Sequence, residues 1–246
     1  MQGRKYLQLV RDLLGQIEET QSEAIEEAAG IIADAVIAGN NLFATGVVHS
    51  ALPVQDIFYR GGGFMLVNII WVPALSSLEE RPPTFTTQLE HLEGFGRLAF
   101  ERAPTQAGDV LILVSTSGRN PVTIEMGMAA QEAGLKVIGV TSMAYNNAVS
   151  SRHSSGKMIY ETMDVVLDNL SAPGDAALEL PGMKQRFCPT SGVGSTAILQ
   201  ALMAETIDQL AARGYDPPVY MPANLDGGAE YNDRKLAEVK DRIFYL

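Results

Sequence analysis

Residues Asp109–Thr141 read DVLILVSTSGRNPVTIEMGMAAQEAGLKVIGVT, and this stretch decides the fold. The apolar runs Asp109–Val114 and Lys136–Thr141 predict two strands. Between them, Pro121–Ala133 predicts a helix with Gly134 as its C-cap. Near-continuous apolar strands suit a sheet that is covered on both faces. A strand, a helix and a strand in this order form a βαβ unit, so the stretch predicts an α/β fold with a parallel sheet.

The same alternation continues on both sides of this unit. Strands are also predicted at 41–46 and 64–72, with a fifth, edge strand at 164–167, and helices at 50–59, 89–102 and 195–213. Before them, apolar residues at helical spacing predict one or two amphipathic helices over Tyr6–Ala38. The pattern therefore predicts a doubly wound, five-stranded parallel sheet with N-terminal helices.

No repeat or low-complexity linker divides the chain. Residues 1–246 are therefore predicted to form a single domain. Its parts are N-terminal helices at 1–39, an α/β core at 40–213 and a C-terminal tail at 214–246. The tail is too polar and turn-rich to form a second core.

Composition restricts the class of protein. The 246 residues are 46% hydrophobic, which allows a substantial core, and 18 basic residues against 29 acidic ones give a formal charge of −11. Nucleic acid is not an expected partner, because phosphate backbones are held by clustered Lys and Arg. The single cysteine forms no internal disulfide and suits a reducing interior. No apolar run approaches the roughly 18 residues of a spanning helix, so we expect a cytoplasmic protein without a membrane partner.

The loop after the strand Asp109–Val114 has the chemistry of a phosphate site. Ser115, Thr116 and Ser117 supply hydroxyl donors, Gly118 allows a tight turn, and Asn120 is a good N-cap for the following helix. On its own, such a loop is also an ordinary connection between a strand and a helix. Two further hydroxyl-bearing turns precede helices, at 46–50 and 189–192. Three such turns favour a shared anion site.

The stretch Asp109–Ser142 resembles the central motif of the sugar isomerase (SIS) domain family. Residues 46–50 and 58–62 are similar to the family's first βα turn, and the resemblance covers about 40–212. Within the family, 153–157 and 224–228 resemble an uncharacterised group related to phosphoheptose isomerases. The resemblance implies a flavodoxin-like fold and a phosphorylated sugar as the ligand. Its phosphate contacts would be Ser50, Ser115, Thr116, Ser117 and Asn120.

Two positions depart from the family pattern. Val48 stands where the family often has a second glycine, which puts close backbone approach to the ligand in doubt. Asn120 stands where a threonine is usual, although an amide can still cap the helix and donate to a phosphate.

Aldose–ketose isomerisation needs a base and a group that carries a proton between two oxygens. The family places an active-site glutamate on a helix near Glu93, which makes Glu93 the first choice for the base. Glu205, on an apolar face of the last helix, is the second. His49 precedes Ser50 on the first turn, and the resemblance suggests that His153 completes its own or a neighbouring subunit's site. The candidates not chosen are Glu80, Glu90, Glu125 and His91.

Other functions stay open at this point. An amino-sugar phosphate etherase or deaminase would use the same phosphate loop, and so would a non-catalytic sugar-phosphate sensor. The three histidines lack metal-site spacing and no nucleotide-binding glycine motif is present, so no metal or cofactor is expected. The apolar stripe from Leu7 to Val36, together with the family resemblance, predicts a homodimer or homotetramer.

Overall fold

The computed structural model describes residues 1–246 and is built around an all-parallel sheet of five strands. The strands follow the order β2-β1-β3-β4-β5. Their bounds are β1 (Leu42–Gly46), β2 (Val67–Ile69), β3 (Val110–Val114), β4 (Lys136–Thr141) and β5 (Val165–Asp168). This confirms the predicted five-stranded, doubly wound sheet, including the edge position of the fifth strand.

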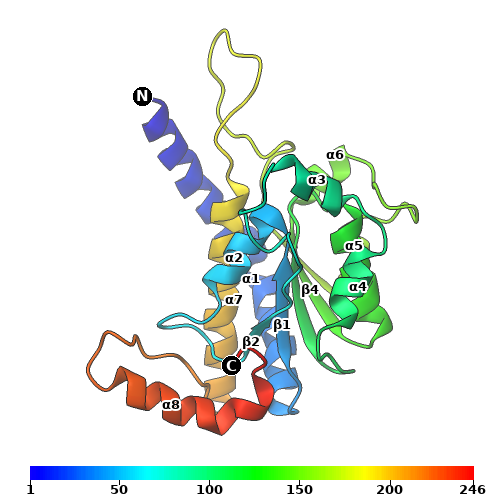
Figure 1. Ribbon diagram of the computed structural model, residues 1–246. Coiled ribbons are helices and arrows are strands. Elements are labelled where there is room, and N and C mark those ends of the chain that lie inside the picture. The colour runs from blue at the N-terminus through cyan, green and yellow to red at the C-terminus, as the bar shows by residue number, and fades with distance from the viewer.

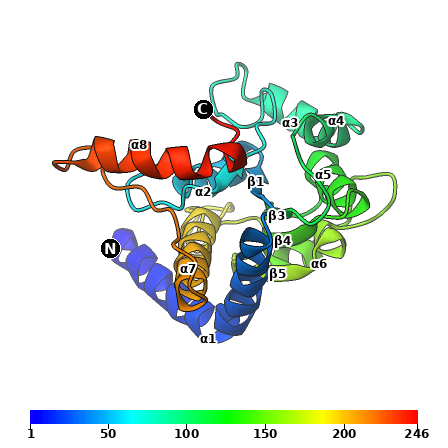
Figure 2. The same cartoon turned by 90° about the horizontal axis from the view of Figure 1, so that it is seen from below.

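Helices cover both faces of the sheet (Figures 1 and 2). One face packs against α1 (Gln2–Ile37), α2 (Ala51–Asp56), α7 (Ser191–Ala212) and α8 (Gly228–Val239). The other face packs against α4 (Phe95–Glu101) and α5 (Pro121–Glu132). Two further helices are short, α3 (Thr84–Glu90) and α6 (Met143–Ala148). The 3₁₀ turns are η1 (Val48–Ser50), η2 (Ile159–Thr162) and η3 (Lys240–Arg242).

The alternation of side chains along the strands divides the core into two layers. In β3, Val110, Ile112 and Val114 belong to the cluster under α1 and α7, whereas Leu111 and Leu113 belong to the cluster under α4 and α5. Successive strand residues point to opposite faces, so a strand that is apolar throughout must be covered on both sides.

Several boundaries differ from those that the sequence predicts. The N-terminal region is one helix, as one of the two predicted alternatives has it, but α1 begins at Gln2 and not at Tyr6. Helix α7 begins at Ser191, four residues before the predicted start at Ser195. The predicted helix 89–102 is two helices, α3 and α4, joined by 91–94. Gly94 has φ of 87° there, and its N–H and that of Gly96 donate to the carboxylate of Glu125. A distant side chain therefore caps α4 and breaks the helix.

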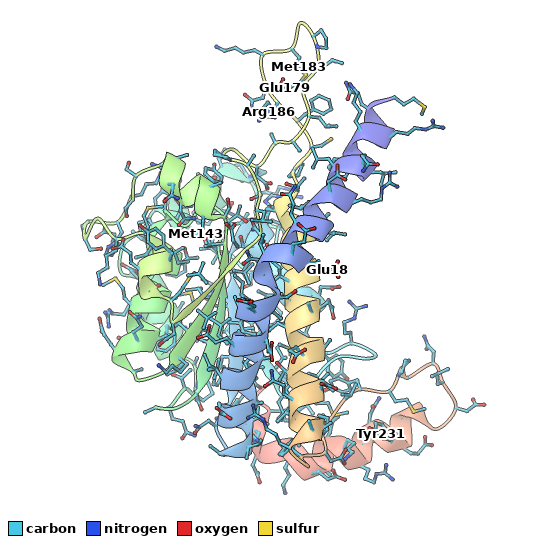
Figure 3. All side chains as sticks on the ribbon, turned by 180° about the vertical axis from the view of Figure 1, so that it is seen from behind. Glu18, Met143, Glu179, Met183, Arg186 and Tyr231 are labelled. Atoms are coloured by element: carbon cyan, nitrogen blue, oxygen red, sulfur yellow. The ribbon has the colours of Figure 1, made fainter.

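One end of the molecule extends beyond the sheet. The connection 171–190 projects there beside the N-terminal half of α1, and Glu179, Met183 and Arg186 mark its outer part (Figure 3). A short antiparallel bridge between Leu178 and Phe187 joins its two arms. None of the helices is both long and apolar enough to cross a membrane.

Candidate active site

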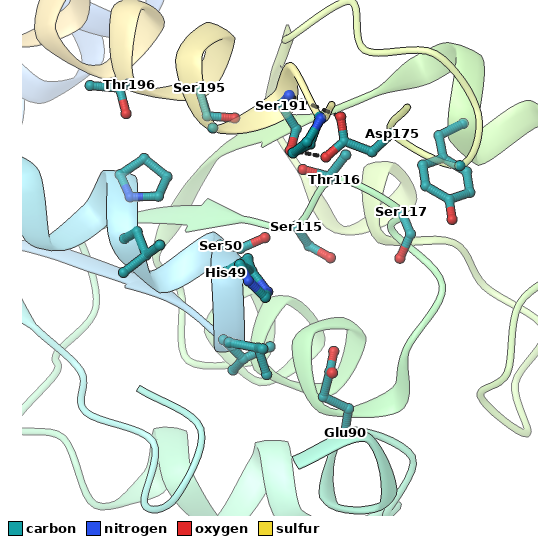
Figure 4. A pocket seen from close by; sticks show the side chains of 18 residues that line it. His49, Ser50, Glu90, Ser115, Thr116, Ser117, Asp175, Ser191, Ser195 and Thr196 are labelled. Carbon is teal, nitrogen blue, oxygen red and sulfur yellow. Dashed lines mark hydrogen bonds between the residues drawn. The ribbon is translucent and has the colours of Figure 1, made fainter. Parts of the chain in front are cut away.

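A cavity opens where β1 and β3 end. Gly46 and Val114, the last residues of these strands, are paired in register, and each is followed by one of the predicted hydroxyl loops. The chain crosses here from one face of the sheet to the other, which is where open α/β sheets bind ligands. The cavity has a volume of about 700 Å³ (Figure 4). Five predicted site residues line it: His49, Ser50, Ser115, Thr116 and Ser117.

The β3–α5 loop is held from below by β4 and α6. The Ser115 N–H donates to the Val140 carbonyl at 3.0 Å, and the Thr141 hydroxyl donates to the Ser115 carbonyl at 2.6 Å. Asn146 is buried and its amide reaches the Thr116 carbonyl at 3.4 Å. The loop backbone is thus fixed before any ligand arrives.

The first βα turn is tight and strained. A Cβ on Gly46 would lie 2.3 Å from the Ser50 carbonyl oxygen, so this position requires glycine. Val48 has φ of 52°, in the left-handed region that β-branched residues disfavour. Its N–H donates to the Leu75 carbonyl at 2.6 Å, which helps to hold this conformation. Glycine would adopt this left-handed backbone without strain.

The third hydroxyl loop opens α7, and an aspartate that the sequence did not single out occupies the helix start. Asp175 accepts hydrogen bonds from the N–H groups of Thr190 and Ser191 at 3.0 and 2.9 Å, and from the Ser191 hydroxyl. Asp175 also lines the cavity, together with Ser191, Ser195 and Thr196. No local signal could reveal this cap, because it comes from the other arm of the projecting connection.

Glu90 is the glutamate that lines the cavity. Its carboxylate points from the end of α3 towards Ser115 and His49 (Figure 4). Burial raises the pKa of Glu90, while a hydrogen bond from Asn120 and the charges of Arg152 and His49 act in the opposite direction. A carboxyl whose pKa is shifted upwards is suited to accept and return a proton near neutral pH.

Asn120 is turned away from the expected phosphate position. Its side chain does not cap α5 and does not line the cavity. Instead, Asn120 Nδ2 donates to Glu90 Oε2 at 2.8 Å, and Asn120 Oδ1 accepts from Arg152 at 2.8 Å. The Asn120 amide therefore donates to the carboxylate of Glu90 and not into the cavity.

The structure places three other predicted residues outside the cavity lining. Glu93 is exposed, and hydrogen bonds from the N–H and hydroxyl of Ser154 hold its pKa below the usual range. Glu205 lies further along α7 and accepts from Gln209 at 3.1 Å. His153 Nε2 lies 3.6 Å from Glu125 Oε1, beneath the start of α4.

The cavity contains no lysine or arginine. Its ionisable lining groups are Glu90, Asp175, His49 and Tyr145, with hydroxyls from three loops around them. An anion held here would rely on hydroxyl and backbone N–H donors at helix starts, which bind anions without a full positive charge.

Comparison with known proteins identifies the family and the fold. A sequence model described as "SIS domain" matches residues 5–142. A "UPF0309 protein" of Streptomyces griseus subsp. griseus is 43% identical over 233 residues, which cover 95% of this chain and 93% of that protein. The UPF0309 protein of Shouchella clausii is 40% identical, with 98% of each chain covered.

A solved phosphoheptose isomerase of Neisseria gonorrhoeae has the same fold. Its TM-score is 0.57 at 21% identity, and 86% of this chain and 97% of that chain are covered. The five-stranded parallel sheet is thus that of a sugar isomerase fold. The 43% identity over nearly the whole length relates the chain to the UPF0309 proteins. The match to the family model over more than half of the chain shows that it belongs to the SIS domain family.

Proposed function

We propose that the chain binds a phosphorylated sugar in this cavity and interconverts its aldose and ketose forms. One observation carries the proposal: the Glu90 carboxylate faces the hydroxyl loop Ser115–Ser117 across a single cavity (Figure 4). An anion site and a base at the same cavity are the two elements that this reaction requires.

The phosphate is assigned to the loop Ser115–Ser117 and to Ser50. Their hydroxyls line the cavity, and the loop leads directly into α5, whose N-terminus favours negative charge. Hydrogen bonds to a charged group contribute about 1.5–3 kcal/mol each. Several such donors can therefore hold a phosphate although no lysine or arginine lines the site.

Glu90 is proposed as the base. It would remove the proton from the carbon next to the carbonyl, giving an enediolate, and return the proton to the neighbouring carbon. His49 also lines the cavity and its charge acts on Glu90, so it is proposed to carry a proton between the two sugar oxygens. The net reaction moves hydrogen within the sugar and needs no further reactant.

The fold also supports a second candidate function. The NanR protein of Vibrio vulnificus, solved in complex with ManNAc-6P, matches with a TM-score of 0.51 at 14% identity, covering 98% of this chain and 69% of that chain. Because a protein of this fold is solved with a sugar phosphate bound, a non-catalytic sugar-phosphate sensor is a second candidate function for this chain. Etherase or deaminase chemistry on an amino-sugar phosphate would use the same carboxylate.

A panel of pentose, hexose, heptose and amino-sugar phosphates tests the proposal. Binding is measured by calorimetry, and turnover by NMR in D₂O, where isomerisation through an enediolate incorporates deuterium at the carbon next to the carbonyl. The double variant Ser115→Ala/Ser117→Ala is expected to weaken binding roughly 100-fold or more, at the energy per hydrogen bond given above.

The outcomes separate the candidates. Deuterium incorporation by the wild type supports the isomerase, whereas binding without any turnover or exchange contradicts it and favours the sensor. Cleavage of an ether bond, or release of ammonia, would favour the amino-sugar chemistry. If the double serine variant binds as tightly as the wild type, the phosphate site lies elsewhere.

A further inference from the structure

The connection between α6 and η2 lies against the phosphate loop and against the segment that follows Glu90. Its backbone is joined to the phosphate loop, because the Arg152 N–H donates to the Arg119 carbonyl and the Ile159 N–H donates to the Gly118 carbonyl, both at 2.9 Å. Three consecutive side chains of this connection, at positions 152 to 154, then face the region around α3 and α4.

Arg152 makes the contacts closest to the proposed base. Its Nη1 atom lies 2.8 Å from Asn120 Oδ1 and 2.8 Å from His91 Nε2. Partial burial and the charges of Arg152 and Arg119 lower the pKa of His91, which favours the neutral ring that can accept from a guanidinium. Arg152 therefore joins the residue after Glu90 to the start of α5.

The guanidinium also determines which way the Asn120 amide faces. Arginine can only donate, so the amide oxygen must be on the Arg152 side and the NH₂ group on the Glu90 side. In the opposite orientation the amide oxygen would face the Glu90 carboxylate and the NH₂ group would face a cation. The hydrogen bond from Arg152 to the amide oxygen of Asn120 thus places the NH₂ donor of the same amide next to Glu90.

The two following side chains fasten the same connection at its outer side. Ser154 donates to Glu93 through its N–H at 2.6 Å and its hydroxyl at 2.7 Å. His153 lies beside Glu125, whose carboxylate caps α4. Both contacts hold the 91–94 turn, and with it the end of α3 that carries Glu90.

We propose that Arg152 is a positioning residue that, through the Asn120 amide, holds the Glu90 carboxylate in place at the cavity. The role rests on the proposed function of Glu90, yet Arg152 itself is outside the cavity lining. A side chain fixed by a second layer of hydrogen bonds keeps the geometry that proton transfer needs.

The first test does not need a substrate. The Glu90 carboxyl is titrated by NMR with ¹³C-labelled glutamate, and Glu90→Gln provides the assignment. The charged groups that face Glu90 are Arg152 from the α6–η2 connection and His49 from η1. Loss of Arg152 removes a positive charge that favours the ionised form of Glu90, so Arg152→Ala is expected to raise the pKa of Glu90 above its wild-type value.

Asn120→Ala and the double variant test the relay. If Arg152 acts through the amide, Asn120→Ala also raises the pKa of Glu90, and adding Arg152→Ala to it raises this pKa further only by the direct effect of the Arg152 charge, so that the two changes sum to less than full additivity. Arg152→Lys keeps the charge without the planar fork and is expected to restore only part of the wild-type behaviour. Lys157→Ala, which removes an exposed charge from the same connection, is the matched control and should titrate as the wild type does.

The second test uses the sugar phosphate that the panel identifies. Arg152→Ala is expected to lower kcat roughly 10–100-fold with KM nearly unchanged, since misplaced catalytic groups cost rate and not phosphate binding. An unchanged Glu90 titration in folded Arg152→Ala, or fully additive effects of the two variants, would overturn the relay. If no sugar phosphate is turned over, the Glu90 titration still tests the relay. The binding of inorganic phosphate then tests the phosphate site, so the relay and the proposed function can fail separately.

Discussion

Gly118 lies directly against the side chain of Asn146, so that a Cβ added to Gly118 would be 2.0 Å from Asn146 Oδ1. Asn146 is buried and donates to Thr141 Oγ1 at 2.8 Å and to the Ser142 carbonyl at 2.7 Å. It cannot move aside without breaking these bonds. Gly118 also has φ of 63°, in the left-handed region. The loop between β3 and α5, to which the phosphate is assigned, is therefore built on a fixed polar support that only glycine can approach.

Gly118→Ala is expected to lower the free energy of unfolding by about 2–5 kcal/mol and to abolish phosphate binding. The left-handed backbone accounts for about 1–2 kcal/mol, and the clash adds about 1–3 kcal/mol. Gly39→Ala is the matched control, because Gly39 has φ of 89° and no atom within 4 Å of an added Cβ. It should show only the backbone term in urea unfolding and keep phosphate binding, and equal losses in the two variants would contradict the role of Asn146.

The position of the loop Ser115–Ser117 at the cavity could be predicted from the sequence because its signals are local. Ser115–Ser117 follow a buried apolar strand and precede a proline-initiated helix, and parallel strands end at a common edge. Ser50 and His49 follow the neighbouring strand in the same way, so they reach the same cavity. The position of each of these residues can be predicted from the strand that precedes it and from the order of the strands in the sheet.

The glutamate that lines the cavity could not be chosen in this way. In one continuous helix over 89–102, Glu90 and Glu93 would lie on the same face, three residues apart. The contact that separates them is the cap that Glu125 places on Gly94 and Gly96, and it joins segments about thirty residues apart in the chain. Asp175 was missed for the same reason, since its partners at 190 and 191 lie across the projecting connection.

Glu90→Gln and Glu93→Gln are expected to behave differently. Glutamine at position 90 cannot accept the proton, so turnover should fall by roughly 10²–10⁴ while binding of the sugar phosphate is nearly unchanged. Glutamine at position 93 only weakens the contact with Ser154, and turnover should fall about tenfold or less. Steady-state kinetics and calorimetry on the same substrate measure both. A larger loss of turnover at Glu93 would return the role of base to that residue.

The pH dependence of kcat/KM should report Glu90. The base acts as the carboxylate, and burial raises its pKa above the ordinary value of 4.5, so activity should fall on the acid side at a pH above 4.5. A raised pKa also means that folding is penalised while the carboxyl is ionised and that this penalty disappears as the pH falls through the folded-state pKa. The thermal stability of the wild type relative to Glu90→Gln should therefore improve on acidification. A wild type that loses stability against the variant at low pH would contradict this sign.

The projecting end of the molecule is expected to mediate assembly. Leu7, Leu180 and Met183 are 60%, 45% and 49% exposed there. The charged side chains that lie with Leu180 and Met183 are those of Lys5, Glu179, Lys184 and Arg186. Light scattering should give a mass of two or four times 26.5 kDa at micromolar concentration. Leu7→Lys with Met183→Lys should shift this mass towards the monomer, whereas Leu225→Lys at the far end, where Leu225 is 54% exposed, should not. A wild-type mass near 26.5 kDa would refute the prediction.

The C-terminal tail closes the β2 edge of the sheet. Phe244 stacks on Phe43 of β1 at 5.8 Å between ring centroids, and its N–H donates to Asn68 Oδ1 of β2 at 2.8 Å. The Tyr245 hydroxyl donates to the Met65 carbonyl at 2.7 Å. The sequence suggested only that the tail has no core of its own, and its contacts instead depend on residues from the first third of the chain.

Removal of residues 244–246 also removes the ring contacts of Tyr245 with Phe58 and Tyr59 and its hydrogen bond with Tyr220. It is therefore expected to destabilise the fold by roughly 4–8 kcal/mol, as the sum of three aromatic pairs at about 0.5–1.5 kcal/mol each and three hydrogen bonds at about 1 kcal/mol each. Removal of Leu246 alone, which is 76% exposed, is the control and should change stability by less than about 0.5 kcal/mol. Urea unfolding measures both changes. Because none of the tail residues lines the phosphate cavity, the shortened chain should bind inorganic phosphate as the full chain does wherever it is folded. Equal stability of the two truncations would show that the aromatic stack and its hydrogen bonds do not hold the sheet edge.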